Sequence, residues 1–313
     1  MIAAKSLRID YDEVTAVFDL DLEIKKGQIY GLVGPNGAGK TSTIKALAGI
    51  LEPTYGEIRI ADMDLELHPQ KALRHLGYMP DFPPVYENLK VWEYLDVFAI
   101  AYRIPSLERA KRVRYWVDRV DLSGKFDAFI HTLSRGMRQR LVLAKTFLPE
   151  PSVLLLDEPA SGMDPMARMD MRKILQEVTL KGTSVLISSH ILTELSDFCT
   201  AIGIMEKGRM VVSGTIEEIR ARIGSKGRLK IRLTNIEDKA RHKILLDLKA
   251  SPLLHDCVEK ALGEFQAYFT GDHRQCGQLL KDLVGNGHAI LDYHLEEDTV
   301  EDIFFKVGAR EVS

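Results

Sequence analysis

The amino-acid sequence predicts an α/β protein with a largely parallel sheet, followed by a second, smaller domain of the α+β class. Apolar runs of strand length at 153–156, 185–188 and 202–205 alternate with helical stretches, which is typical of parallel α/β layering. A glycine-rich loop joins a further apolar run, at 29–33, to a helix. The chain has 313 residues, of which 45% are hydrophobic, so it can bury one core of about 200 residues and still form a second domain.

The composition and charge argue against several classes of protein. No apolar run reaches the roughly 18 residues of a membrane-spanning helix, and the N-terminus carries charges where a signal peptide has its apolar segment, so we expect a soluble, cytosolic chain. Cys199, Cys257 and Cys276 lack metal-ligand spacing, and their odd number argues against a disulfide framework. The formal net charge of −3 lacks the basic excess of a general nucleic-acid binder, so we expect no nucleic-acid partner.

The first domain is predicted to contain two kinds of subdomain. Strand-like runs separated by turns fill the first 60 residues, at 3–11, 15–24, 29–33 and 57–60. Two of the turns between them are of the hairpin type, which indicates an antiparallel β subdomain. Between about 82 and 150 the pattern changes to helical periodicity, with Tyr94 on one apolar face and Trp116 on another. We therefore expect a helical subdomain inserted into the sheet.

The domain boundaries follow from changes in pattern near residue 222. The predicted parts are a first domain at 1–222, a linker at 223–227 and a second domain at 228–313. A helix at 216–223 closes the first domain. Apolar and polar residues alternate from Leu229, a helix follows, and an amphipathic helix runs from about 300 to 307. The second domain is therefore predicted to be a small α+β unit.

The glycine-rich loop has the pattern and context of a phosphate-binding loop. It consists of Gly34, Pro35, Asn36, Gly37, Ala38, Gly39, Lys40 and Thr41. Glycines let successive backbone N–H groups point at phosphate oxygens, and the helix start adds its positive dipole end. Lys40 can reach the β- and γ-phosphates, Thr41 can hold Mg²⁺, and Ser42 can touch the α-phosphate. The loop alone leaves kinases, GTPases and motor ATPases open.

A second chemical signal is the apolar strand 153–156, which ends in two carboxylates. The carboxyl ends of the strands are where open α/β sheets bind their ligands. Asp157 is expected to hold Mg²⁺ through water, and Glu158 to act as the general base that activates the attacking water. His190 follows the next apolar strand and could hydrogen-bond the γ-phosphate, although a lone histidine at a strand end is more often structural.

Two further segments complete a family pattern. Leu133–Arg140 reads LSRGMRQR and is separated from Asp157 by 16 residues, and 161–165 reads SGMDP. With these, residues 1–222 resemble the ATPase domains of ABC proteins. The resemblance implies a P-loop NTPase fold of the ABC type with an antiparallel β subdomain and a helical insert, and it implies ATP and Mg²⁺ as ligands.

The resemblance also implies a head-to-tail dimer, with a second copy or a related ATPase. Ser134 and Gly136 of one subunit would cap the γ-phosphate bound by the other, and Asp164 would communicate across the dimer. Without the resemblance, Ser134 is simply a good N-cap. Tyr11 is placed like the family's adenine-stacking aromatic, with ordinary edge-strand packing as the alternative.

The sequence departs from the family pattern at two places. The signature reads LSRGM where the usual form is LSGGQ, which keeps the serine and the second glycine but puts the contact of the fifth position in doubt. The family's glutamine after the strand 76–79 is replaced by Asp81. A carboxylate can still bind Mg²⁺, yet it only accepts hydrogen bonds. We expect altered coupling and retained hydrolysis.

The tail resembles that of single-cassette exporter ATPases, including drug- and sodium-extrusion types, although its last helix could simply pack on its own domain. The resemblance implies a subunit that energises export through a separate transmembrane permease, bound peripherally to the inner face of the cell membrane. The alternative is a soluble ABC protein that acts on the ribosome or nucleic acid. Such proteins usually carry two cassettes or a coiled-coil insert, and this chain has one cassette and neither addition.

Overall fold

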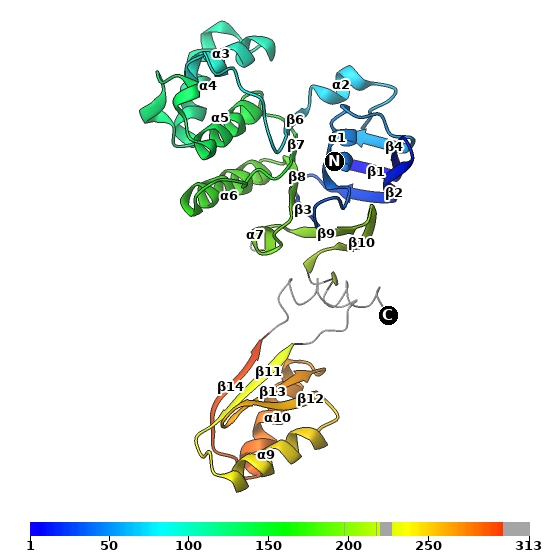
Figure 1. Cartoon of the computed structure of the whole chain (residues 1–313), viewed down its shortest axis with the longest axis vertical. Helices are drawn as coiled ribbons and strands as arrows, with labels where there is room; N and C mark the ends of the chain where they lie inside the picture. The colour runs from blue at the N-terminus through cyan, green and yellow to red at the C-terminus, as the bar shows by residue number, and fades with distance from the viewer. Residues whose placement is uncertain (197, 217, 220–226, 297–313) are drawn as a thin grey trace. The chain divides into compact units, whose positions relative to one another are not determined.

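The computed structural model describes residues 1–196, 198–216, 218–219 and 227–296. The chain divides into two compact units, Met1–Thr215 and Ile216–Ser313, which are drawn in Figure 1. This division lies a few residues before the boundary predicted at 222. Most of the predicted linker, and all of the amphipathic helix expected at about 300–307, lie outside the described residues.

A six-stranded sheet forms the centre of the first unit, with the strand order β10-β9-β3-β8-β7-β6. Its strands are β3 (Ile29–Val33), β6 (Leu76–Met79), β7 (Val153–Leu156), β8 (Ser184–Ser189), β9 (Ala201–Glu206) and β10 (Arg209–Gly214). All neighbours pair in parallel except β10, which is antiparallel to β9. Every residue of β3, β7 and β8 is buried, which explains the continuous apolar runs. The predicted parallel layering is confirmed.

The antiparallel sheet predicted for the N-terminal residues is also present, with the order β2-β1-β4-β5. Its strands are β1 (Ile2–Tyr11), β2 (Val14–Ile24), β4 (Tyr55–Ile60) and β5 (Met63–Asp64). The short helix α2 (Pro69–Leu73) follows. One core joins this sheet to the parallel sheet, because Leu7 and Leu20 belong to the same buried cluster as Leu32 of β3 and Ile44 of α1 (Lys40–Leu47).

Three α-helices lie in the predicted helical range: α3 (Val91–Ala101), α4 (Ser106–Arg119) and α5 (Arg135–Phe147). The faces expected from the sequence are buried, including Tyr94 and Trp116. Trp116 stacks on Phe147 of α5, with ring centroids 4.9 Å apart. Two more helices, α6 (Pro165–Leu180) and α7 (Thr193–Ser196), follow the sheet strands. No helix in the described ranges has the length and apolar character needed to cross a membrane.

The second unit has the β-α-β-β-α-β order of a split βαβ fold. Its elements are β11 (Arg228–Leu233), α9 (Asp238–Ala250), β12 (Leu254–Ala261), β13 (Glu264–Phe269), α10 (His273–Gly285) and β14 (Ile290–Glu296). The strand order is β12-β13-β11-β14, with every neighbouring pair antiparallel. Alternate residues of β11 are buried, as the sequence predicted, and pack with Phe265 and Leu248 in a separate core. The small α+β architecture therefore agrees with the prediction.

The Arg241 guanidinium ties α9 to β12, and this contact makes a pH-dependent contribution to stability. Its Nε and Nη2 atoms donate to Glu259 at 2.6 and 2.9 Å, and these bonds lower the pKa of Glu259 to about 2. Because the folded-state pKa lies below the ordinary value, the stabilisation is complete at neutral pH and is lost as the pH falls from about 4.5 toward 2.

We therefore expect Glu259→Gln to lower the stability of the second unit by about 1 kcal/mol at pH 7, since the pair is partly exposed. Hydrogen exchange of peptides that cover β12 and β13 in the full chain should be about fivefold faster in the variant at pH 7. The difference should shrink steadily below pH 4.5. An equal acceleration at pH 7 and pH 3 would contradict the assignment.

Candidate active site

The phosphate loop connects β3 to α1 and depends on two glycines. A Cβ atom on Gly34 would lie 2.2 Å from the carbonyl oxygen of Met205, so no larger residue fits there. Gly39 has a φ of 101°, which favours glycine, and a Cβ atom on it would lie 2.6 Å from the carbonyl oxygen of Ala16. Helix α1 has no acidic side chain in its first turn and no side-chain cap. Its first N–H groups are therefore suited to an anion.

Lys40 is buried at the start of α1, with 6% of its surface exposed. Its Nζ atom donates hydrogen bonds to the carbonyl oxygens of Gly34 at 2.7 Å and Pro35 at 3.2 Å. The Oε1 atom of Glu158 lies 3.6 Å from the same nitrogen. Burial lowers the pKa of Lys40, while Glu158 and Asp157 raise it, so the carboxylates favour the charged form.

The two carboxylates at the end of β7 are fixed by a side chain of the neighbouring strand. Ser188 of β8 donates its hydroxyl hydrogen to Oδ1 of Asp157 at 2.7 Å, and its oxygen accepts the backbone N–H of Glu158 at 2.9 Å. Asp157 is 1% exposed. Glu158 has a φ of 47°, a left-handed conformation that is strained for a residue with a side chain. The hydroxyl of Ser188 therefore positions both acids.

Ser188 has no place among the residues singled out by the sequence analysis. The available signal was a pair of serines, Ser188 and Ser189, that follows the apolar run 185–187 and precedes His190. Its partners lie about 30 residues away in the chain, and only the pairing of β7 with β8 brings them together.

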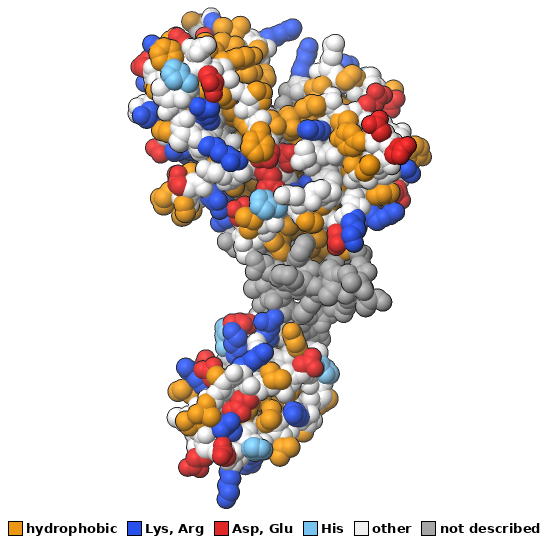
Figure 2. Space-filling view, in the orientation of Figure 1, with side chains coloured by type: hydrophobic (Ala, Val, Ile, Leu, Met, Phe, Trp, Pro, Cys, Tyr) orange, Lys and Arg blue, Asp and Glu red, His pale blue; other side chains and the backbone are white. Residues whose placement is uncertain are grey.

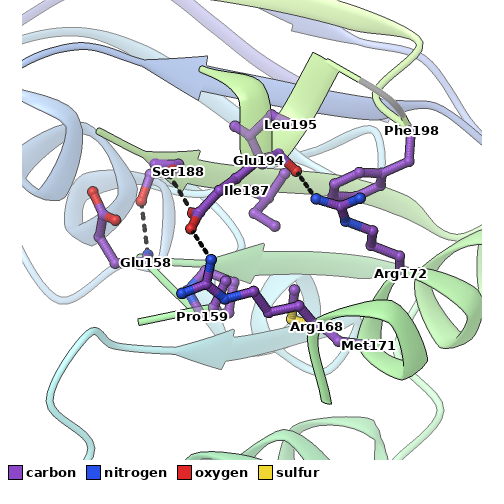
Figure 3. Close-up of a pocket in the computed structure, with 12 residues that line it drawn as sticks. Glu158, Pro159, Arg168, Met171, Arg172, Ile187, Ser188, Glu194, Leu195 and Phe198 are labelled. Carbon is purple, nitrogen blue, oxygen red and sulfur yellow. Dashed lines mark hydrogen bonds and ion pairs between the residues drawn. The ribbon is translucent and has the colours of Figure 1, made fainter. Parts of the chain in front are cut away.

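His190 lies next to Glu158, with its Nδ1 atom 2.9 Å from Oε2 of the carboxylate. The turn that carries the histidine is tied to Glu194 of α7, whose carboxylate accepts a hydrogen bond from Ser189 at 3.1 Å. Arg168 of α6 donates to the same carboxylate at 2.6 Å, and Figure 3 shows Arg168 pointing toward Glu194. The structure therefore brings the predicted base, Glu158, into direct contact with His190. The turn that carries the histidine is held by Glu194, which Arg168 in turn binds.

Asp81 follows β6 and lies beside the same acids. Its Oδ1 atom is buried and has no hydrogen-bond partner in the described part of the chain. Burial, Asp157 and Glu158 all raise the pKa of Asp81. An orphaned carboxylate oxygen among other carboxylates fits a site for a divalent cation, because such ions prefer oxygen ligands. The described residues do not form a complete ligand set by themselves, so nucleotide oxygens and Thr41 would have to contribute.

Lys40, Asp81, Glu158 and His190 line a cavity of about 470 Å³. Its wall includes residues 36–42 of the phosphate loop together with Ala16, Asp81, Phe82, Glu158, Ser161 and His190. Figure 2 shows acidic side chains and a histidine gathered in the hollow of the first unit. Tyr11 lies at the other end of the loop, 44% exposed, and its hydroxyl donates to Ser42 Oγ at 3.3 Å. Its ring is therefore accessible, as an adenine-stacking residue requires.

The signature residues and Asp164 lie at helix starts. Ser134 caps α5, because its hydroxyl oxygen accepts the N–H of Met137 at 3.3 Å. Asp164 caps α6 in the same way, by accepting the N–H of Ala167 at 2.9 Å. Neither Ser134 nor Gly136 lines the 470 Å³ cavity of its own chain. Their expected contact with a nucleotide in a second subunit stays a prediction.

The role of Ser188 can be tested by Ser188→Ala. Removing a hydrogen bond to a charged group costs about 1.5–3 kcal/mol, so kcat for ATP hydrolysis should fall roughly tenfold to hundredfold. Ser184→Ala is the matched control, because Ser184 is a buried serine at the opposite end of β8, where its hydroxyl bonds the carbonyl of Lys25. Equal loss of kcat in both variants, measured at saturating ATP, would contradict a local role.

Comparisons with known proteins agree with this geometry. The family model of ABC transporters matches residues 17–161. The bacitracin transport ATP-binding protein BcrA of Bacillus licheniformis is 30% identical over 298 residues, covering 95% of this chain and 94% of that protein. The probable multidrug ABC transporter ATP-binding protein YbhF of Escherichia coli is 34% identical over 221 residues, covering 71% of this chain, which spans only 38% of that protein.

Solved structures agree as well. A structure of an ATP-binding subunit of an ABC transporter is 32% identical, with a TM-score of 0.67, and the match covers 72% of this chain and 93% of that one. The bacterial ABC transporter cassette MJ0796 is 21% identical with a TM-score of 0.64, covers 69% of this chain and 99% of its own, and shows the likeness of fold. The chain belongs to the ABC transporter family, among its ATP-binding ATPase subunits.

Proposed function

We propose that this chain binds and hydrolyses ATP with Mg²⁺ and so energises export through a separate transmembrane permease. The observation that carries the proposal is the convergence of Lys40, Asp157, Glu158 and His190 at the carboxyl ends of β3, β7 and β8. A buried amine, a water-activating carboxylate and a histidine are the groups that phosphate hydrolysis requires.

ATP binds along the phosphate loop in this proposal. The N–H groups of residues 36–42 and the Lys40 ammonium contact the phosphates, and the exposed ring of Tyr11 stacks on the adenine. Thr41, Asp157 and Asp81 hold Mg²⁺, the last two as carboxylates that repel each other without a cation. When bound, the ion neutralises charge that develops on the phosphate oxygens.

Glu158 accepts a proton from the attacking water as the water oxygen bonds the γ-phosphorus and the bond to the β-phosphate oxygen breaks. His190 is held 2.9 Å from Glu158, so it can orient that carboxylate and reach the γ-phosphate with its other nitrogen. The hydroxyl of Ser188 keeps Asp157 and the backbone of Glu158 in a fixed relation through the reaction. Lys40 supplies a fixed positive charge at the transferred group.

A second copy of the chain, or a related ATPase, completes the site. Ser134 and Gly136 lie at the start of α5, a helix with no acidic side chain in its first turn. Such a helix start favours an anion, and the γ-phosphate bound by the partner has the matching charge. Asp164 lies at the start of α6, in the loop that follows Glu158, and is placed to report the contact to the base.

The partner on the membrane side contacts the helical subdomain. Four aromatic rings form a continuous group there, Tyr86, Tyr94, Phe98 and Tyr102, with centroids of neighbouring rings 4.9 to 6.4 Å apart. Tyr86 is 59% exposed and Tyr102 is 40% exposed. Figure 2 shows hydrophobic side chains gathered over this subdomain. Exposed aromatic residues are typical of interaction sites, and we assign this one to the permease at the inner face of the membrane.

Export as the direction of transport rests on the relatives. The Bacillus licheniformis protein is named for bacitracin transport, the Escherichia coli protein for multidrug transport, and a third relative, from Ralstonia nicotianae, for export of Nod factor. The last is 32% identical over 219 residues, covering 70% of this chain and 68% of that protein. The cargo itself is selected by the permease.

Replacing the proposed base tests the hydrolytic mechanism. Glu158→Gln keeps the shape of the side chain but cannot accept the proton, so kcat should fall by about 10²–10⁴-fold while ATP binding remains. The variant should also form an ATP-dependent dimer, detectable by analytical ultracentrifugation. Glu206→Gln is the control, since Glu206 lies at the end of β9 outside the cavity lining. Normal turnover by Glu158→Gln would exclude Glu158 as the base.

A pull-down of the tagged chain from its native cells in a gentle detergent tests the partner. We expect mass spectrometry to identify a multi-spanning membrane protein. Tyr86→Asp should reduce its recovery at least about tenfold, because a buried charge opposes docking. Tyr55→Asp is the control, because Tyr55 is 68% exposed on the antiparallel sheet. Recovery of ribosomal proteins or nucleic acid in place of a membrane protein would favour the soluble alternative.

A further inference from the structure

We propose that Arg135 is a positioning residue that fixes the start of α5 to the two loops that follow Asp81 and Glu158. The inference rests on the proposed function, because it gives the purpose of this link as presenting Ser134 and Gly136 to the partner's nucleotide. Arg135 stands where the usual signature of the family has a glycine, so the link is a property of this chain's own sequence.

The side chain of Arg135 reaches both loops. Its Nη2 atom donates a hydrogen bond to the hydroxyl oxygen of Ser161 at 3.1 Å. Its guanidinium carbon lies 5.2 Å from the centre of the Phe82 ring, a distance typical of a cation–π contact. Ser161 and Phe82 both line the nucleotide cavity. Arg135 therefore connects the helix of the signature to two walls of the site.

The backbone beneath this side chain is packed as closely as glycine allows. A Cβ atom on Gly136 would lie 2.9 Å from the carbonyl oxygen of Gly162, so the two turns touch backbone to backbone. A Cβ atom on Gly162 would lie 3.0 Å from Nε of Arg135, and the φ of this glycine is 75°. The stem of the arginine therefore covers Gly162, and the contact fixes the distance between the turns as well as their orientation.

The charge of Arg135 acts on Asp81 at a distance, where it lowers the pKa of that carboxyl, but it has no direct carboxylate partner in the described part of the chain. It makes no ion pair with a carboxylate of the described residues, whereas Arg138, one turn later in α5, pairs with Glu87 at 2.8 Å. A positive charge at the first residue of a helix also opposes the helix dipole. The contacts with Ser161 and Phe82 offset this cost, which supports a positioning role for the side chain.

The link has a specific functional consequence. Ser134 and Gly136 can cap a phosphate in the partner only if α5 is held at a fixed distance from the loop that carries Asp164. No residue of α5 lines the cavity in its own chain, so Arg135 does not itself contact a nucleotide bound there. Loss of Arg135 should therefore weaken dimer closure and lower kcat, and leave the affinity of the single chain for ATP unchanged.

The experiment compares Arg135→Ala and Arg135→Lys in the Glu158→Gln background of the full chain. ATP affinity, measured by titration with a fluorescent ATP analogue at low protein concentration, should change less than about twofold. The dissociation constant of the ATP-dependent dimer, from analytical ultracentrifugation, should rise about tenfold for Arg135→Ala, equivalent to about 1.4 kcal/mol. Lysine should restore less than half of this loss, because it lacks the planar fork of arginine.

The matched control is Arg114→Ala, which removes a guanidinium stacked 4.5 Å from Phe126 elsewhere in the helical subdomain. It should leave dimerisation unchanged. Ser161→Ala removes the same hydrogen bond from its other partner. The double variant should therefore lose no more dimer affinity than Arg135→Ala alone, because both substitutions remove the same contact. Independent, multiplying effects, or an unchanged dimer with Arg135→Ala, would overturn the proposal. Equal losses with Arg114→Ala would also overturn it.

Failure of the proposed function gives a different result. If the Glu158→Gln parent remains monomeric with ATP, the homodimer is wrong whatever Arg135 does. Arg135 is then tested by steady-state hydrolysis with otherwise native residues. A fall in kcat with unchanged KM, in both Arg135→Ala and Ser161→Ala, supports the link. A rise in KM alone contradicts it.

Discussion

The structure depends on the balance between one buried ammonium group and the carboxylates that face it. Lys40 is almost fully enclosed, and burial alone favours its neutral form. Glu158, Asp157 and Asp81 oppose that effect, yet they repel one another, and burial together with this repulsion raises the pKa of Asp81. One lysine does not neutralise three acids. The arrangement is therefore best stabilised by a divalent cation together with a polyphosphate, since each supplies the charge that the other lacks.

The register of the parallel sheet brings these groups together. Leu156 pairs with Ile187 and with Met79 on its other side, and Val33 pairs with Ser189, so β3, β6, β7 and β8 end at the same edge. Each functional side chain follows its strand by a few residues. A shift of one strand by two residues would move the functional side chain that follows it by about 7 Å, too far to contact the other groups of the site.

Sequence reasoning predicts the parts of this site that are local in the chain. The strands 29–33, 76–79 and 153–156 have the bounds expected from the sequence, and in the first and third every residue is buried, which leaves no polar position within them. Ser188 and Arg135 escaped prediction because their partners are set by pairing and packing across 26 or more residues. The order β12-β13-β11-β14 escaped it too, since alternation identifies a strand and says nothing about its neighbour.

The segment after β6 makes two electrostatic contacts, and the aspartate at position 81 accounts for the first of them. Asp81 faces the carboxylate cluster, and the next residue, Phe82, presents its ring to the guanidinium of Arg135. A cation bound between Asp81 and Asp157 would pull on the same backbone that Arg135 holds to α5. A glutamine in place of Asp81 would bind such a cation without a net charge and would respond to it less strongly. The acid at position 81 and the arginine at position 135 therefore act on neighbouring residues of one segment, so under the proposed link a change of charge at Asp81 would act on the segment that Arg135 contacts.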